Sequence, residues 1–295
     1  MFRTALISMF LTSTALGNPW YVDDDGKADF DNIQAAIDAA SDGDMIFVYP
    51  GTYTSTADEV VNMLGKAVTL RSLYPNNPDV VATTIIDGEG VRRGIVCDSD
   101  ETSKTIIEGF TITNGYAKNG GGMWNDYSSP TLNGCTFTSN YAVFGGGMSN
   151  DNNSPTLTDC TFTNNSATFA GGMGNYNSSS PTLTDCTFTG NTATYNGGGM
   201  YNYKSNPTLT DTIICGNSPD QINGDWTDNG GNTIADECPS DCPDINGDGY
   251  VGITDLLAVI DVWGCTDCSD VDVNQDGIVN LDDLVIVFNA WGPCP

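Results

Sequence analysis

Two acidic segments near the C-terminus carry the residues best suited to chemistry in this 295-residue chain. One runs from Asp244 to Asp255, and the other from Asp272 to Asp283. In each, side-chain oxygens occupy positions 1, 3, 5 and 12, glycine occupies position 6, and position 7 offers its carbonyl. Ca²⁺ takes about six to eight such hard oxygen ligands, so the spacing predicts two bound ions. The predicted ligands are Asp244, Asn246, Asp248, Tyr250 and Asp255, and then Asp272, Asn274, Asp276, Ile278 and Asp283.

Each predicted loop is followed by one apolar helical stretch, at 256–264 and 284–292, and each stretch ends in Trp-Gly. Paired loop–helix units with Asp at position 12 resemble the type I dockerin domain, over residues 243–295. That resemblance implies a cohesin-like or cell-surface partner, and dockerins usually carry carbohydrate-active enzymes. Positions 10 and 11 are Ile253-Thr254 and Leu281-Asp282, and neither helix contains Lys or Arg. A calcium-folded surface or sorting module is therefore the alternative.

The composition narrows the classes of function. The net charge is −29, from 9 Lys and Arg against 38 Asp and Glu, and the chain has no His. Nucleic acids and anionic membrane surfaces are disfavoured as partners because both need basic patches. Ser-His and Cys-His catalysis are excluded. Residues 1–17 read as a signal peptide with an apolar stretch too short to span a bilayer, which predicts a secreted or cell-surface protein. No other segment is apolar enough to span a membrane.

A fourfold repeat occupies residues 119–217. Its period is about 25 to 27 residues, and such a period indicates a solenoid. The distance from Pro to the closing Asn is constant, whereas the glycine-rich and polar turns vary in length. Strands of fixed register joined by elastic turns predict a parallel β-helix over residues 18–235, with about eight or nine coils. The landmarks are Met123, Met148, Met173 and Met200; Pro130, Pro155, Pro181 and Pro207; and Asn140, Asn165, Asn191 and Asn217.

Alternation within the repeat assigns the faces of its strands. Cys and Phe of each Cys-Thr-Phe-Thr segment point inward and both Thr point outward. Stacking then makes each position a ladder, and the amides of two Asn ladders are expected to hydrogen-bond along the axis. The inward residues are Leu132, Cys135 and Phe137 and their counterparts; the second Asn ladder is Asn125, Asn150, Asn175 and Asn202.

A cap precedes the repeats. Asp31 and Gln34 have the spacing of a capping box, and Phe30, Ile33 and Ile37 fall on one helical face, so a helix is expected to cover the first coil. The stretch FDNIQAAIDAASDGDMIFVYPGTY resembles the cap and first coil of pectin-lyase-like right-handed parallel β-helices, which implies fold alone. The repeated Phe-x-x-Asn and Gly-Gly-Met phrases resemble repeats of polymorphic outer-membrane proteins, a bacterial adhesin family.

Ten cysteines in a secreted chain favour disulfides. Cys135, Cys160 and Cys186 are expected to be buried thiols of the ladder, and Cys97 stands alone. The expected pairs are Cys215–Cys238, Cys242–Cys294 and Cys265–Cys268, with a four-cysteine zinc site as the alternative. Residues 236–242 read as a linker.

The predicted β-helix offers two kinds of candidate site. Two of its early carboxylates could flank a glycosidic bond beside Arg93. Tyrosines of the turns could stack on sugars, whereas the column of Phe144, Phe169 and Tyr195 is expected to lie mainly in the core. The sequence thus favours a surface protein that binds a glycan or protein; the alternative is a polysaccharide lyase or glycoside hydrolase delivered by the dockerin-like module. The carboxylates are Asp87, Glu89, Asp98, Asp100 and Glu108, and the tyrosines are Tyr127, Tyr176 and Tyr203.

Overall fold

A computed structural model of the chain describes residues 17–238, 243, 245–246, 250–266, 268, 271–274, 277–289 and 292–293. The chain divides into two compact units, Met1–Cys238 and Pro239–Pro295. The predicted signal peptide, apart from Gly17, lies outside the described residues. Within the described residues, no helix combines the length and the apolar character needed to cross a membrane.

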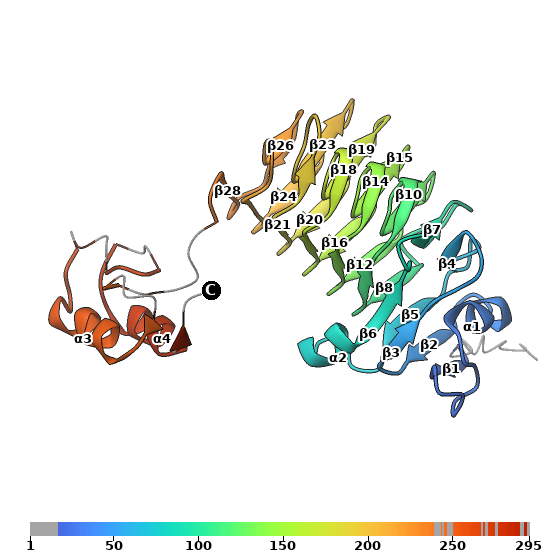
Figure 1. Cartoon of the computed structure of the whole chain (residues 1–295), viewed down its shortest axis with the longest axis horizontal. Helices are drawn as coiled ribbons and strands as arrows, with labels where there is room; N and C mark the ends of the chain where they lie inside the picture. Colours follow the sequence, from blue (N-terminus) through green and yellow to red (C-terminus); the bar gives the residue numbers. More distant parts are fainter. Residues whose placement is uncertain are drawn as a thin grey trace, which may run out of the picture. The chain divides into compact units, whose positions relative to one another are not determined.

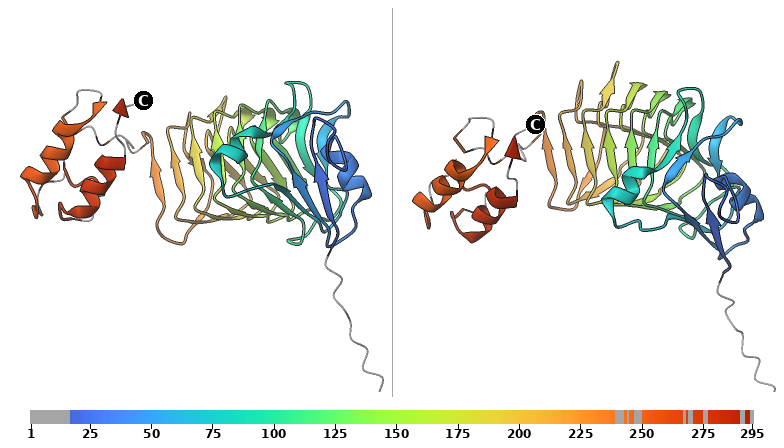
Figure 2. Two further views of the ribbon diagram at one scale, coloured as in Figure 1. Left: turned by 90° about the horizontal axis from the view of Figure 1, so that it is seen from below. Right: turned by 60° about the horizontal axis from the view of Figure 1, so that its bottom comes forward.

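The first unit is a stack of parallel strands arranged in four sheets (Figures 1 and 2). A nine-stranded sheet contains β1 (Pro19–Val22), β2 (Met45–Val48), β5 (Thr69–Ser72), β8 (Ile106–Glu108), β12 (Thr131–Asn133), β16 (Thr156–Thr158), β20 (Thr182–Thr184), β24 (Thr208–Thr210) and β27 (Thr227–Asp228). An eight-stranded sheet contains β3 (Gly51–Tyr53), β6 (Thr84–Asp87), β9 (Thr111–Thr113), β13 (Thr136–Thr138), β17 (Thr161–Thr163), β21 (Thr187–Thr189), β25 (Ile213–Cys215) and β28 (Thr233–Ala235).

Two shorter sheets complete the stack, and the smaller of them is present in four of its turns. A seven-stranded sheet contains β4 (Glu59–Asn62), β7 (Arg93–Cys97), β11 (Met123–Asp126), β15 (Met148–Asp151), β19 (Met173–Tyr176), β23 (Met200–Tyr203) and β26 (Ile222–Asn223). A four-stranded sheet contains β10 (Tyr116–Asn119), β14 (Tyr141–Phe144), β18 (Ser166–Phe169) and β22 (Thr192–Ala193). The stack thus has about eight turns, and the predicted parallel β-helix is confirmed.

The core follows the predicted alternation. Phe137 and Phe162 pair in register and stack with centroids 4.8 Å apart, and Phe162 and Phe188 stack at 4.5 Å. Cys135, Cys160 and Cys186 are buried free thiols, as expected. Because every coil places the same side chain at the same point, apolar burial is continuous along the axis.

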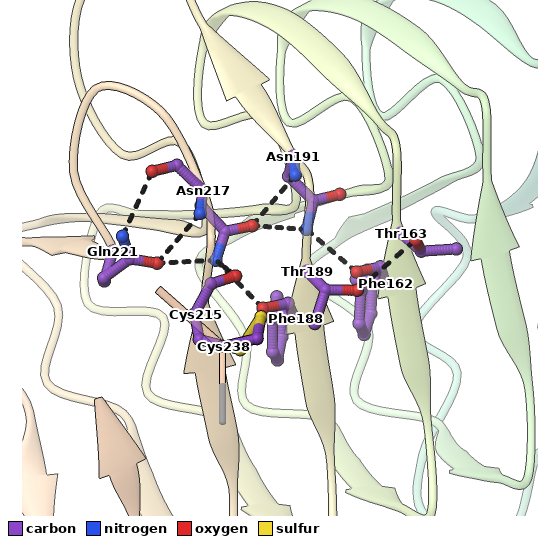
Figure 3. Close-up of a disulfide and its surroundings, with 9 residues drawn as sticks. All are labelled: Phe162, Thr163, Phe188, Thr189, Asn191, Cys215, Asn217, Gln221 and Cys238. Carbon is purple, nitrogen blue, oxygen red and sulfur yellow. Dashed lines mark hydrogen bonds between the residues drawn. A yellow bond between two sulfur atoms is a disulfide. The ribbon is translucent and has the colours of Figure 1, made fainter. Parts of the chain in front are cut away.

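Both predicted Asn ladders form. Asn140 donates to Asn165 Oδ1 at 3.0 Å, Asn165 to Asn191 at 2.9 Å, and Asn191 to Asn217 at 2.9 Å. Gln221 Oε1 closes this column by accepting from Asn217 Nδ2 at 2.8 Å (Figure 3). The other ladder, from Asn125 to Asn202, is bonded in the same direction. These buried amides fix the register of the turns.

The last coil is tied down by a disulfide between Cys215 and Cys238, as expected. Cys265 and Cys268 are also bonded, so these four cysteines are not thiolate ligands. The predicted Cys242–Cys294 pair lies outside the described residues.

Helix α1 (Ile33–Ala39) caps the first coil, and it packs on β1, β2 and β4. The predicted N-cap is wrong by one residue: Asn32, not Asp31, has the extended backbone of a cap, and its side chain accepts from Ala35 N at 2.8 Å. Gln34 does not reach back to the cap. Its amide instead pairs with the backbone of Asn62, which ties the helix to β4. A second short helix, α2 (Pro78–Thr83), packs on β6 and β9.

The second unit contains α3 (Ile253–Asp261), α4 (Leu281–Asn289) and an antiparallel pair, β29 (Tyr250–Val251) with β30 (Gly292–Pro293). Both helices begin three residues earlier than expected. The reason is that Asp255 and Asp283 accept from the backbone N–H of Gly252 and Asn280, so each carboxylate caps a helix that starts inside its loop. The core of this unit is built from equivalent residues of the two halves: Val251 and Val279, and Val259 and Val287.

Candidate functional site

A groove of about 450 Å³ lies on the β-helix, between the outer faces of the four-stranded and seven-stranded sheets. It spans four successive coils, from β10 to β23. Aromatic rings make up much of its lining, and few charged groups are present. The lining residues are Lys118, Asn119, Phe144, Ser149, Asp151, Phe169, Tyr176, Asn177, Tyr201 and Tyr203.

The hollow arises from small residues in one outward column. Trp124, Ser149, Gly174 and Tyr201 pair in register on β11, β15, β19 and β23, so two small residues lie between two large aromatic ones. The Tyr176 ring folds over the space at Gly174, where a Cβ would meet it at 2.7 Å. Gly174 is thus required by a close approach and not by a turn.

The Tyr176 side chain is the most informative group in the groove. Its ring packs edge-on against Phe144 and Tyr201, with both centroids 5.9 Å away. Its hydroxyl is buried and has no hydrogen-bond partner among the described residues. Burial raises the pKa of Tyr176, so the hydroxyl keeps its proton. A buried hydroxyl without a partner costs free energy, which a ligand in the groove could recover.

The column of Phe144, Phe169 and Tyr195 is not core, and its first two members line the groove. Phe144 and Phe169 are half-buried and stack at 5.7 Å, Phe169 stacks on Tyr195 at 5.0 Å, and Tyr195 is 60% exposed. The expectation of a core column was wrong because Phe144 and Phe169 end strands β14 and β18, in which Ala142 and Ala167 fill the inward positions instead. The alternative, a binding stripe, fits their place in the groove.

A second outward column begins with two carboxylates, of which Asp151 lines the groove. Asp126 and Asp151 pair in register on β11 and β15, and Tyr176 and Tyr203 continue the column. Burial, together with the charges of Asp151 and Asp98, raises the pKa of Asp126. Neither Asp126 nor Asp151 was singled out from the sequence. Their offset of 25 residues was a readable signal, but the next two coils replace Asp with Tyr and hide it.

The carboxylates first considered for catalysis are not gathered by the fold. Asp87 lies on β6 and Glu108 on β8, which belong to different sheets, and Asp98 follows β7 of a third sheet. Arg93 is already engaged: it donates to the carbonyls of Asn119 and Gly120, lies 4.0 Å from Glu59, and covers the Trp124 ring at 4.9 Å. Its role is to support Trp124 beside the groove.

A second hollow, of about 790 Å³, lies beside α2. Arg71 and Glu108 pair across its floor at 3.6 Å, so the two charges offset each other. No aromatic ring lines this hollow. It therefore lacks the large apolar surfaces that orient most small ligands, and the aromatic groove is the stronger candidate.

In the acidic loops, the two position-12 carboxylates have equivalent surroundings. Asp255 Oδ1 accepts from Asn246 N, and Asp283 Oδ1 accepts from Asn274 N, both at 3.1 Å. Both carboxylates are fully buried, so each is directed back into its own loop. This donor chemistry fits a calcium loop. Asp244, Asp248 and Asp276 lie outside the described residues, and the roles of Asp272, Tyr250 and Ile278 as ligands stay predictions.

Three comparisons with known proteins give the following findings. No curated protein matches the chain. A solved structure, described as the crystal structure of pectate lyase Pel9A, is similar at a TM-score of 0.47 and 14% identity, over 67% of this chain. The chain spans about half the length of that protein, 54%. A family model described as "Right handed beta helix region" matches residues 79–214, and this part of the chain is thus similar to right-handed β-helix proteins, in agreement with the parallel stack.

Proposed function

We propose that the aromatic groove binds a glycan and that the protein is a secreted or surface-exposed glycan-binding β-helix. The observation that carries this proposal is the buried, unpartnered hydroxyl of Tyr176 within a wall of aromatic rings. Apolar faces of sugar rings pack on aromatic side chains, and sugar hydroxyls supply the missing hydrogen bond. Ligand sites commonly combine such apolar walls with a few fixed polar groups.

Affinity measurements across polysaccharides test the groove. Calorimetry with xylan, β-glucan, galactomannan and polygalacturonate should identify at least one ligand of the full-length protein. Tyr176→Phe removes one hydrogen bond and should weaken binding by about three- to tenfold. Phe169→Ala removes part of the wall and should weaken binding more. Tyr74→Ala is the matched control, because Tyr74 is 62% exposed and does not line the groove. Equal affinity in all three variants would contradict the proposal.

The C-terminal unit is proposed to bind two Ca²⁺ ions and to attach the protein to a cohesin-like or cell-surface partner. The equivalent, buried carboxylates of Asp255 and Asp283 support calcium. Each helix also exposes apolar residues at matching positions: Ile253 and Leu257 on α3, and Leu281 and Val285 on α4. Exposed apolar side chains in equivalent places favour a protein partner over solvent.

Pull-down with the full-length protein separates these two roles. Immobilised protein should retain a cohesin-like domain in Ca²⁺ and lose it in EGTA, and Leu257→Lys combined with Val285→Lys should abolish retention without loss of Ca²⁺ binding. Retention that is unchanged by EGTA would count against calcium control. A carbohydrate-active enzyme remains the second candidate function, and the carboxylate of Asp151 in the groove, next in register to Asp126, favours it.

A further inference from the structure

Two exposed tyrosines, Tyr116 and Tyr141, stack on each other near the aromatic groove. They are register partners on the neighbouring strands β10 and β14 (Figure 1), and their ring centroids lie 5.5 Å apart with the planes 13° from parallel. Tyr116 is 52% exposed and Tyr141 is 44% exposed. Among the described residues, no other ring packs on either of them. Because β10 is an edge strand of the four-stranded sheet, one face of the Tyr116 ring is free of aromatic neighbours.

The tyrosine pair and the groove lie on the same outer face of the four-stranded sheet. Lys118 lines the groove, and it follows Tyr116 by two residues on β10. Side chains two residues apart on a strand point the same way and lie about 7 Å apart. Phe144, which also lines the groove, ends β14 three residues after Tyr141. Three residues span about 10 Å along a strand, which is about the length of two pyranose units in an extended chain, so one chain can reach both places.

The aromatic surface runs along the strands from this pair to the groove. In the next two coils the partners of Tyr141 in register are Ser166 and Thr192, which have no ring to stack on a sugar. Phe144 and Phe169 continue the aromatic column at the other end of the strands instead. The groove has a volume of about 450 Å³, near the lower end of the range of about 300–1,000 Å³ for small-ligand sites. It therefore holds a short segment of a polysaccharide, and the adjoining sugar units need a surface outside it.

Charges in and around the groove disfavour an acidic chain. Among the described lining residues, Lys118 is the one cation and Asp151 the one carboxylate, so their charges offset each other. Asp126 adds a second carboxylate as the register partner of Asp151. Two further cations, Arg93 and Lys204, each lie over an aromatic ring, at 4.9 Å and 5.1 Å from its centroid, so both are already engaged. With a net charge of −29, the protein also repels a polyanion at long range.

We propose that the glycan is a neutral polysaccharide and that Tyr116 and Tyr141 form a second subsite for the sugar units that adjoin those in the groove. This inference rests on the proposed glycan binding, and it adds the class of glycan and the course of the chain. Sugar rings pack their C–H groups on aromatic side chains, and this contact requires no charge. A neutral chain thus makes apolar contacts at both places, and Lys118 and Asn119 supply hydrogen-bond donors between them.

The dependence of affinity on chain length tests the second subsite. Calorimetry of the full-length protein uses cellulose, xylan and mannan fragments of two to six sugar units. In at least one series the affinity should rise about tenfold from the dimer to the hexamer. Tyr141→Ala should weaken hexamer binding about three- to tenfold and leave dimer binding within about twofold. Tyr21→Ala is the matched control, because Tyr21 is also an exposed ring that stacks on its register partner, Phe47 at 5.4 Å, but does not line the groove.

Oligogalacturonides of the same lengths test the charge class on the wild-type protein, so the result does not depend on folding of a variant. They should bind at least about tenfold more weakly than the best neutral series. Raising NaCl from about 50 mM to about 500 mM should change the neutral affinity less than about twofold. Tighter binding of the acidic series, or equal affinity for dimer and hexamer, would overturn the inference. If Tyr176→Phe and Phe169→Ala still weaken dimer binding in that case, the proposed function stands. If no glycan binds, both fall.

Discussion

Single buried amides decide whether a coil can stack on its neighbour. Asn165 accepts from the backbone N–H and the side chain of Asn140, and it donates to Asn191 Oδ1 and to the carbonyl of Phe137. The carboxamide of Asn supplies two N–H donors and a carbonyl acceptor, and the single O–H donor of Ser or Thr cannot replace both donated bonds. The recurrence of Asn thus reflects a requirement for hydrogen bonding in the interior.

Replacing Asn165 by Ala should lower the free energy of unfolding by about 3 kcal/mol, because several buried donors and acceptors lose their partner. Urea denaturation followed by far-ultraviolet circular dichroism measures the change. Asn133→Thr serves as the control: Asn133 is an outward residue whose register partner is Thr158, so its replacement should cost less than about 1 kcal/mol. A loss of similar size in both variants would argue against the ladder as a source of stability.

Ionised Asp126 should lower the free energy of unfolding, whereas the buried amide of Asn165 raises it. Its pKa is raised in the folded protein, by burial first and then by Asp151 and Asp98, so ionisation at neutral pH opposes folding. Asp126→Asn should therefore stabilise the protein at pH 7, by less than about 1 kcal/mol because the group is partly solvated. The gain should shrink as the pH falls through the raised pKa and vanish below the ordinary carboxyl range. Thermal unfolding of both proteins from pH 3 to pH 8 checks this, and a gain that grows in acid would refute it.

The sequence predicted which side chains point inward, but it did not predict the groove. Inward residues such as Phe162 repeat in each coil because the core requires it. The groove instead depends on departures from the repeat: Ser149 and Gly174 where other coils have Trp or Tyr, and Asp126 and Asp151 where later coils have Tyr. The groove forms where side chains differ in size and charge between coils, and a search for repeated residues does not reveal these differences.

At the scale of elements, the strand register could be predicted, because the segment between Pro and Asn has the same length in every repeat. The helix boundaries could be predicted less well. The start of α1 depends on Asn32 reaching Ala35, and the starts of α3 and α4 depend on carboxylates that also belong to the loops. Adjacent residues of similar chemistry, such as Asp31 and Asn32, cannot be ranked as caps without the backbone conformation.

The last coil is the element most exposed to fraying, because β28 pairs on one side with β25 and has no further strand beyond it in the eight-stranded sheet. The Cys215–Cys238 bond closes this end across 23 residues. Replacing both cysteines by Ser should destabilise the coil by about 2–4 kcal/mol. Hydrogen exchange should accelerate at Thr233–Ala235 and remain slow at Thr136–Thr138. The Cys265→Ser, Cys268→Ser protein is the control, and faster exchange of β28 there would contradict a local effect.

At the scale of the whole molecule, the two units derive their stability from different sources. The β-helix has one continuous apolar core, whereas the second unit has a small core of paired valines and two buried carboxylates. A unit of this size buries a small core and is marginally stable, so a bound ion can supply a large part of its stability.

Calcium should thus stabilise one unit alone. In Ca²⁺, calorimetry of the full-length protein should show a transition that EGTA moves to lower temperature, while the main transition stays within about 2 °C. Asp283→Ala should mimic EGTA. Asp261→Ala should not, since Asp261 is an exposed residue of α3 outside the loops. A shift of the main transition with EGTA would place calcium in the β-helix instead.

The Asn ladders also give the stack a net side-chain dipole along its axis. In both columns each amide donates towards the later coil, so their dipoles point the same way and add along the axis. Asn125 Oδ1, at the start of one column, has no hydrogen-bond partner among the described residues, while Gln221 receives the end of the other. The coils from Asn125 to Gln221 therefore carry aligned side-chain dipoles, as the peptide units of an α-helix are aligned along its axis.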